Sequence, residues 1–259
     1  MSALCVLLVS AASGQTRKPK KPAKSAIPAA VVTEPAPLPV VEAAGTPHKR
    51  NERPAMAVIE TVKPSDATSA FAYEFSRPGF NYSRVAIGHD ENGKGTISFQ
   101  KDDSDEVLTD PIQLSAVTLK NLAEAYTALD FINSTEVYQH EKDFSNMGNS
   151  VITARRDGRT RTAKYNWTEN KHAKFLMDEY RRIGNEYTWK FELMSARANQ
   201  PLLTPGLMDL VDSYIKRKEI SDPPHLLPFL TQLSSDERLP LMARNHAARL
   251  AKQIEKSQK

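Results

Sequence analysis

The placement of proline constrains this chain more than any other feature of its sequence. Nine of the 17 prolines fall between Pro19 and Pro64. Proline fixes φ and lacks a backbone N–H, so neither a helix nor a central strand runs through a stretch in which it recurs. This stretch also shows no lasting hydrophobic period, and we expect residues 15–66 to be a disordered linker with polyproline II character. The folded part of the chain is therefore predicted to begin near residue 67.

An apolar, uncharged run from Ala3 to Ala12 precedes the linker. It is shorter than the roughly 20 residues that a transmembrane helix needs. Small residues follow it, so the pattern predicts a secretory signal peptide over residues 1–14, cleaved between Gly14 and Gln15. No Lys or Arg precedes the run, which leaves two alternatives open: a start upstream of Met1, or a short buried segment. We predict an exported protein, either periplasmic or secreted.

Cys5, the single cysteine, lies inside this apolar run. Cleavage as predicted leaves a mature chain without cysteine, which excludes disulfides, thiolate metal sites and cysteine nucleophiles. Five basic residues follow the cleavage position: Arg17, Lys18, Lys20, Lys21 and Lys24. They either contact an anionic membrane surface or envelope polymer, or are solvated charges behind a signal peptide.

Alternating hydrophobicity begins in the stretch FAYEFS, where Phe71, Tyr73 and Phe75 have the period of a half-buried strand. Two more alternating runs flank the turn-forming stretch HDENGKG and predict a hairpin. In SVITARRDGRTRTAKYNW, the Asp157-Gly158 pair predicts a two-residue hairpin turn. That register places on one face Ile152, Ala154, Arg156, Arg159, Arg161, Ala163, Tyr165 and Trp167.

Helical periodicity follows each group of strands. Leu119, Leu122, Tyr126 and Leu129 form one apolar face behind Ser115, a good N-cap residue. A 3-to-4 spacing from 170 to 198 predicts a long helix with an apolar stripe of Leu176, Tyr180, Ile183, Tyr187, Phe191 and Met194. The predicted order is three strands, a helix, a hairpin and a long helix. This order favours an α+β domain over 67–198, an antiparallel sheet of hairpins packed with two main helices.

Residues 199–259 are predicted to form a small all-helical C-terminal segment, with Asp236 capping its last helix. Whether this segment is a separate domain stays open. A signal peptide, a Pro-rich tether and a small α+β domain together resemble the layout of uncharacterised exported bacterial proteins. The resemblance is one of layout, and it implies no active-site residue.

Charge is distributed unevenly along the predicted domain. Residues 86–145 carry 12 acidic and 4 basic side chains, whereas residues 151–198 carry 11 basic and 6 acidic ones. Arg156, Arg159 and Arg161 concentrate the positive charge at the hairpin tip. They either bind a carboxylate, phosphate or acidic polymer of a partner through their guanidinium forks, or pair with the acidic segment of the same chain.

Other chemistry is weakly indicated, and no cofactor, metal or transmembrane span is predicted. The chain lacks the GxSxG, Walker A and GxGxxG motifs. We therefore expect a non-enzymatic binding module, possible partners being an anionic envelope component or a protein. One alternative is a hydrolase with a site built from His140, Asp143 and His172. Another, for a protein that is not exported, is nucleic-acid binding by the arginine hairpin with Tyr165 and Trp167.

Overall fold

A computed structural model of the chain describes residues 69–258. The predicted signal peptide, its cleavage position between Gly14 and Gln15, and the Pro-rich linker lie outside these residues. The described strands are β1 (Phe71–Ser76), β2 (Tyr82–His89), β3 (Lys94–Lys101), β4 (Val107–Gln113), β5 (Asn149–Arg156) and β6 (Arg159–Tyr165). The α-helices are α1 (Ala116–Ala128), α2 (Lys171–Asn199), α3 (Thr204–Lys216), α4 (Leu227–Ser235) and α5 (Leu241–Ser257). The predicted α+β class with a helical C-terminal segment is confirmed.

The six strands form one antiparallel sheet in the order β4-β3-β2-β1-β5-β6. The expected strand around FAYEFS is β1, and the expected hairpin around HDENGKG is β2–β3. The prediction of three strands before the first helix was wrong, because β4 adds a fourth. Its sequence, VLTDPIQ, holds Pro111, which is tolerated here because β4 lies at the edge of the sheet.

The β5–β6 hairpin has the register that the sequence predicts. Arg156 pairs with Arg159 and Ala154 with Arg161, so the three arginines share a face with the buried Ile152. Asp157 and Gly158 both have positive φ, 51° and 73°, which a type I′ turn requires. The prediction that Asp157-Gly158 forms a two-residue turn is confirmed.

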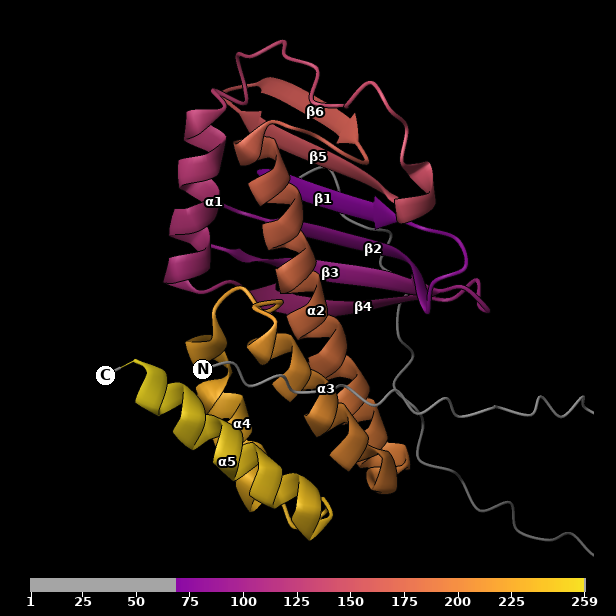
Figure 1. Cartoon of the computed structure of the whole chain (residues 1–259), viewed down its shortest axis with the longest axis vertical. Helices are drawn as coiled ribbons and strands as arrows, with labels where there is room; N and C mark the ends of the chain where they lie inside the picture. Colours follow the sequence, from indigo (N-terminus) through magenta and orange to yellow (C-terminus); the bar gives the residue numbers. More distant parts are fainter. Residues whose placement is uncertain (1–68, 259) are drawn as a thin grey trace, which may run out of the picture. The chain divides into compact units, whose positions relative to one another are not determined.

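Helices α1 and α2 pack on one face of the sheet, with α2 crossing its middle (Figure 1). Ser115 caps α1 by accepting a hydrogen bond from the Thr118 backbone N–H, as predicted. Asn170 caps α2 in the same way, through the N–H groups of His172 and Ala173. The core between these layers includes Ile87, Ile97, Phe99, Leu122, Ile152, Leu176, Tyr180 and Ile183.

The second half of α2 extends past the edge of the sheet and also packs against the C-terminal helices (Figure 1). Trp189 and Leu193 of α2 are buried there with Met208, Leu230 and Leu250. This half of α2 therefore has a second apolar face, while Tyr187 and Phe191 of the predicted stripe still pack against the sheet core. Met194, the last member of the stripe predicted from the sequence, is exposed.

Asp236 does not cap the last helix, and that prediction was wrong. It occupies the C-cap position of α4, and its carboxylate pairs with Arg197 at the end of α2. Pro240 directly precedes α5, where its missing N–H costs no helical hydrogen bond. Within residues 69–258, no helix is both long and apolar enough to cross a membrane.

Candidate functional site

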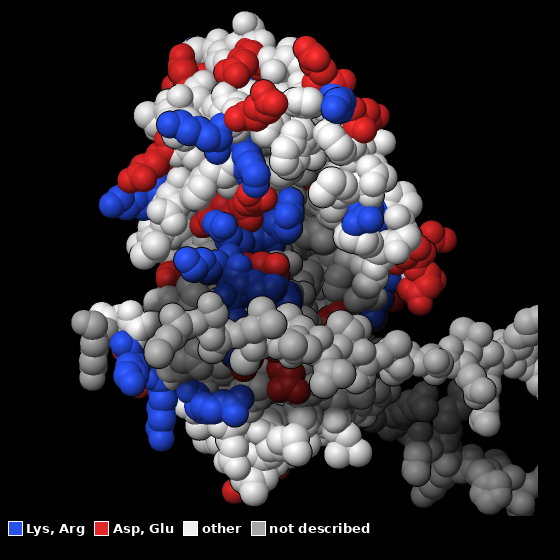
Figure 2. Space-filling model, in the orientation of Figure 1, with Lys and Arg blue, Asp and Glu red and all other residues white. Residues whose placement is uncertain are grey.

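A cavity of about 660 Å³ lies between α2 and the strands β1 and β2, and it is lined further along by α3. Its size falls within the range typical of small-molecule sites. Figure 2 shows the face that α2 crosses, where basic side chains gather beside a hollow. The cavity is larger than two other cavities of about 580 and 190 Å³, and it combines an apolar floor with charged residues at its rim.

The floor of the cavity is aromatic and aliphatic. Tyr73 stacks on Tyr180 with ring centroids 5.0 Å apart, and Phe75 and Val85 continue the floor along the sheet. Gly184 of α2 lies above Val85, and a Cβ built there would be 3.7 Å from Val85 Cγ1. The absence of a side chain at Gly184 therefore keeps this part of the cavity open.

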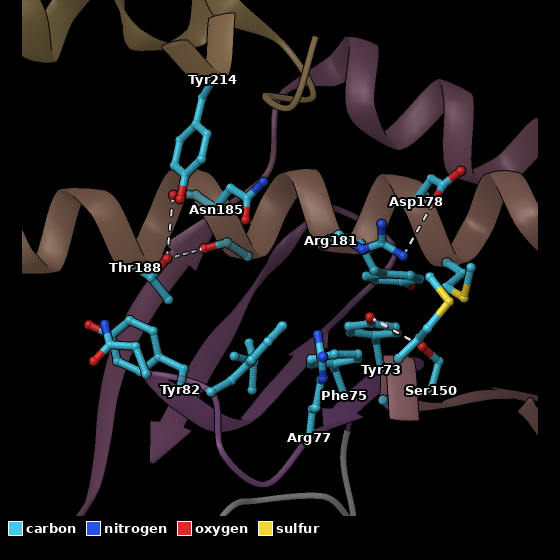
Figure 3. A pocket seen from close by; sticks show the side chains of 18 of the residues that line it. Tyr73, Phe75, Arg77, Tyr82, Ser150, Asp178, Arg181, Asn185, Thr188 and Tyr214 are labelled. Atoms are coloured by element: carbon cyan, nitrogen blue, oxygen red, sulfur yellow. Dashed lines mark hydrogen bonds and ion pairs between the residues drawn. The ribbon is translucent and has the colours of Figure 1, made fainter. Parts of the chain in front are cut away.

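Two basic side chains of α2 pair with one carboxylate at one end of the cavity, and a third basic side chain also lines the cavity. Lys174 Nζ lies 2.5 Å from Asp178 Oδ2, and Arg181 Nη2 lies 3.5 Å from Asp178 Oδ1. Arg77 reaches the same gap from the turn after β1, with its guanidinium 3.5 Å from the Phe80 ring centroid. Figure 3 shows Arg77 and Arg181 pointing into the gap from the sheet side and the helix side. We call Arg77, Lys174 and Arg181 the basic end.

The other end of the cavity carries an acid. Glu192 accepts hydrogen bonds from the Tyr82 hydroxyl at 2.7 Å and from Asn81 Nδ2 at 3.5 Å. Burial and then the hydrogen bond to Glu192 raise the pKa of Tyr82. Tyr214 of α3 also lines this end, and its pKa is raised by burial and then by the charge of Glu192. We call Glu192, Tyr82 and Tyr214 the acidic end.

The arginines predicted to bind a partner all contact the acidic segment of their own chain. Arg156 Nη2 lies 3.5 Å from Glu91, and Arg159 donates to Asn133. Arg161 donates to the carbonyl oxygens of Phe131 and Glu136, both at 2.7 Å. These contacts fit the structural interpretation of the charge pattern, most clearly for Arg161.

Two residues of the hydrolase alternative, His140 and Asp143, contact other side chains and backbone groups. His140 Nε2 lies 3.2 Å from Glu169, and Asp143 accepts from Asn166 and from the Ser145 backbone N–H. His172 is in the first turn of α2. Among residues 69–258, no group of three or more His, Cys, Asp or Glu side chains is arranged to hold a metal ion.

Tyr165, a stacking residue in the nucleic-acid alternative, is buried and donates a hydrogen bond to the Ala173 carbonyl at 2.6 Å. It therefore presents no open ring face to a base. Trp167 instead lines the large cavity, as does Trp189. Both tryptophans of the chain thus report on this one site.

A buried hydrogen-bonded chain connects the cavity floor to a smaller cavity of about 190 Å³. Tyr126 and Tyr180 hydroxyl oxygens are 3.0 Å apart, and His89 Nε2 lies 3.0 Å from the Tyr180 hydroxyl. His89 Nδ1 lies 2.8 Å from the Asp90 carbonyl oxygen, so Nδ1 carries the proton and Nε2 accepts from Tyr180. Burial lowers the pKa of His89, which favours the neutral form of the ring.

Sequence reasoning missed the large cavity, although one signal for it is present. Lys174, Asp178, Arg181 and Asn185 are spaced 4, 3 and 4 residues apart, which puts a polar stripe beside the apolar stripe of α2. Nothing in this spacing shows that the stripe faces Arg77 and the aromatic floor. In comparisons with known proteins, the chain matches no family model and no curated protein.

Proposed function

We propose that this protein is an exported, non-enzymatic binding module whose large cavity takes a ligand with an apolar body and an anionic group. The observation that carries the proposal is the basic end: Lys174 and Arg181 pair with the Asp178 carboxylate, and Arg77 adds a third cation to the lining beside an aromatic floor. The net charge of this group is +2, so one anionic group is accommodated without unpaired negative charge. Export rests on the apolar run at the start of the sequence.

The chemistry of the basic end favours a carboxylate or a phosphate. The guanidinium of Arg181 is planar and donates two parallel hydrogen bonds to such groups. The side chains of Lys174 and Arg181 are 45% and 55% exposed, so both are accessible to a ligand. The apolar body then covers Phe75 and Val85, and removing apolar surface from water contributes about 25 cal/mol per Å².

Dodecanoate is a suitable first probe because it has an apolar chain and one carboxylate. Titration into the full chain is expected to produce a saturable change in tryptophan fluorescence. Arg181→Gln is expected to weaken binding about tenfold, the effect of losing roughly 1.4 kcal/mol of interaction. Gly184→Leu is expected to block binding by filling the cavity above Val85, whereas Gly184→Ala adds one methyl group and serves as its matched control.

Lys252→Gln is the matched control for charge, since Lys252 is an exposed residue of α5 outside the cavity lining. The proposal fails if dodecanoate causes no saturable change, or if Arg181→Gln and Lys252→Gln bind it equally.

The arginine hairpin is a second candidate surface for an anionic partner. The Arg156 side chain is 61% exposed, and its ion pair with Glu91 is at the surface. Surface pairs of this kind are weak and are readily exchanged for a partner's acid. The test is capture of an anionic polymer such as heparin by Arg156→Ala/Arg159→Ala, which spares Arg161. Unchanged capture by this double variant contradicts a role for the hairpin tip.

A further inference from the structure

Glu192 at the acidic end has hydroxyl and amide donors but no counter-cation. Within residues 69–258, no Lys, Arg or His nitrogen lies within 4.0 Å of its carboxylate oxygens. Lys101 shares the lining of a neighbouring cavity with Glu192 but is not paired with it. The site therefore has a negative charge, partly buried, that a cationic group of a ligand can neutralise.

The two ends of the cavity have opposite charge and a defined separation. The basic end sums to +2 with Asp178 included, and the acidic end to −1. Arg181 and Glu192 lie on the same helix, 11 positions apart, which corresponds to about 16 Å along its axis. A ligand that neutralises both ends has an anionic and a cationic group separated by about that distance.

We infer that the ligand is a short peptide with free ends, bound with its carboxylate at the basic end and its ammonium at Glu192. This inference rests on the proposed function, because both use the same cavity. An extended chain spans about 3.3–3.6 Å per residue, so about five residues bridge the two ends.

The wall between the ends suits a peptide better than a plain hydrocarbon chain. Amide and hydroxyl side chains line it, among them Ser150, Asn185 and Thr188. Their partners within the chain are the Tyr73 hydroxyl, the Glu219 carbonyl and the Gly184 carbonyl respectively, but their oxygens keep further lone pairs that can accept from peptide N–H groups, which a hydrocarbon does not supply. Alternate apolar side chains of an extended peptide point to one side and reach the floor of Phe75 and Val85.

The test uses the peptide Ala-Leu-Ala-Leu-Ala in free, N-acetylated and C-amidated forms, titrated into the full chain by calorimetry and tryptophan fluorescence. Acetylation removes the ammonium and is expected to weaken binding about tenfold. Glu192→Gln is expected to weaken binding of the free peptide by the same factor. The Glu192→Gln variant is then expected to bind the free and the acetylated peptide with equal affinity. C-terminal amidation of the peptide and Arg181→Gln are expected to be non-additive in the same way. In each case the peptide modification and the substitution remove opposite partners of one ion pair, so combining them costs little more than either alone.

Glu124→Gln is the matched control, since Glu124 is an exposed acid on α1 outside the cavity lining. Urea denaturation of Glu192→Gln checks that the fold is intact. Equal binding of free and acetylated peptide, while dodecanoate still binds, overturns the peptide inference and leaves the proposed function standing. Absence of binding by dodecanoate and by every form of the peptide overturns both.

Discussion

Replacing Arg161 by alanine is expected to destabilise the fold, although Arg161 belongs to a positively charged hairpin. Its guanidinium donates to the Phe131 and Glu136 carbonyl oxygens and to the Tyr138 hydroxyl, at 2.7, 2.7 and 3.1 Å. It also lies 4.8 and 5.0 Å from the ring centroids of Phe131 and Tyr138. The side chain thus ties β6 to the segment that follows α1.

The magnitude follows from these contacts. A hydrogen bond from a charged donor contributes about 1.5–3 kcal/mol when buried, and less where water replaces the donor. Arg161 is half-buried, so the three bonds together are expected to contribute about 2–3 kcal/mol rather than their full sum. With a denaturant slope of about 2 kcal/mol per M, the urea midpoint of Arg161→Ala falls by about 1–1.5 M.

Urea denaturation followed by circular dichroism measures this change. Arg161→Lys keeps the charge but loses the planar fork, and we expect a midpoint between those of wild type and Arg161→Ala. Arg159→Ala on the same face is the matched control, because Arg159 is exposed and, among residues 69–258, has one side-chain hydrogen-bond partner, Asn133. Its effect is expected to stay within about 0.5 kcal/mol. Equal midpoints for Arg161→Ala and Arg159→Ala would refute the structural role of Arg161.

Three further predictions concern stability. Gly184→Ala is expected to raise the free energy of unfolding by about 0.5–1 kcal/mol, because alanine favours the helix and its Cβ lies at ordinary contact distance from Val85. A lower urea midpoint for Gly184→Ala than for wild type contradicts this prediction. Burial opposes ionisation of Glu186, but the His225 hydrogen bond and the Lys190 ammonium outweigh it and hold the pKa of Glu186 below its ordinary value. The stability from Glu186 is therefore present above about pH 4.3 and lost as the pH falls through the lowered pKa, and Glu186→Gln should flatten that loss in urea titrations. Burial lowers the pKa of His89, so the contribution of neutral His89 to the free energy of unfolding is complete above about pH 6.5 and declines as the pH falls. His89→Gln should remove that decline, and an unchanged dependence of the urea midpoint on pH contradicts this role of His89.

Much of the fold was predictable because its signals are local. Asp157-Gly158 specifies a turn by its own backbone preferences, and Ser115 specifies a helix start by its own side chain. The edge strand β4 was not predictable, because Pro111 and Asp110 argue against a strand unless the strand's place in the sheet is known. Asp236 was assigned to the wrong helix end, because its partner Arg197 lies 39 positions away.

The α+β class, the register of the β5–β6 hairpin and the extent of the long helix follow from the amino-acid sequence, since periodicity and turn chemistry act over a few neighbouring residues. Which charged side chains meet depends instead on how distant elements pack. Arg77 and Arg181 are 104 positions apart, and they line one cavity because the strand order and the crossing of α2 bring them together. The same non-local packing turns Arg161 toward backbone carbonyls and places Glu192 at the cavity with no cation of residues 69–258 paired to it. Periodicity identifies the face on which a side chain lies, but the partner on that face is fixed by elements distant in the chain.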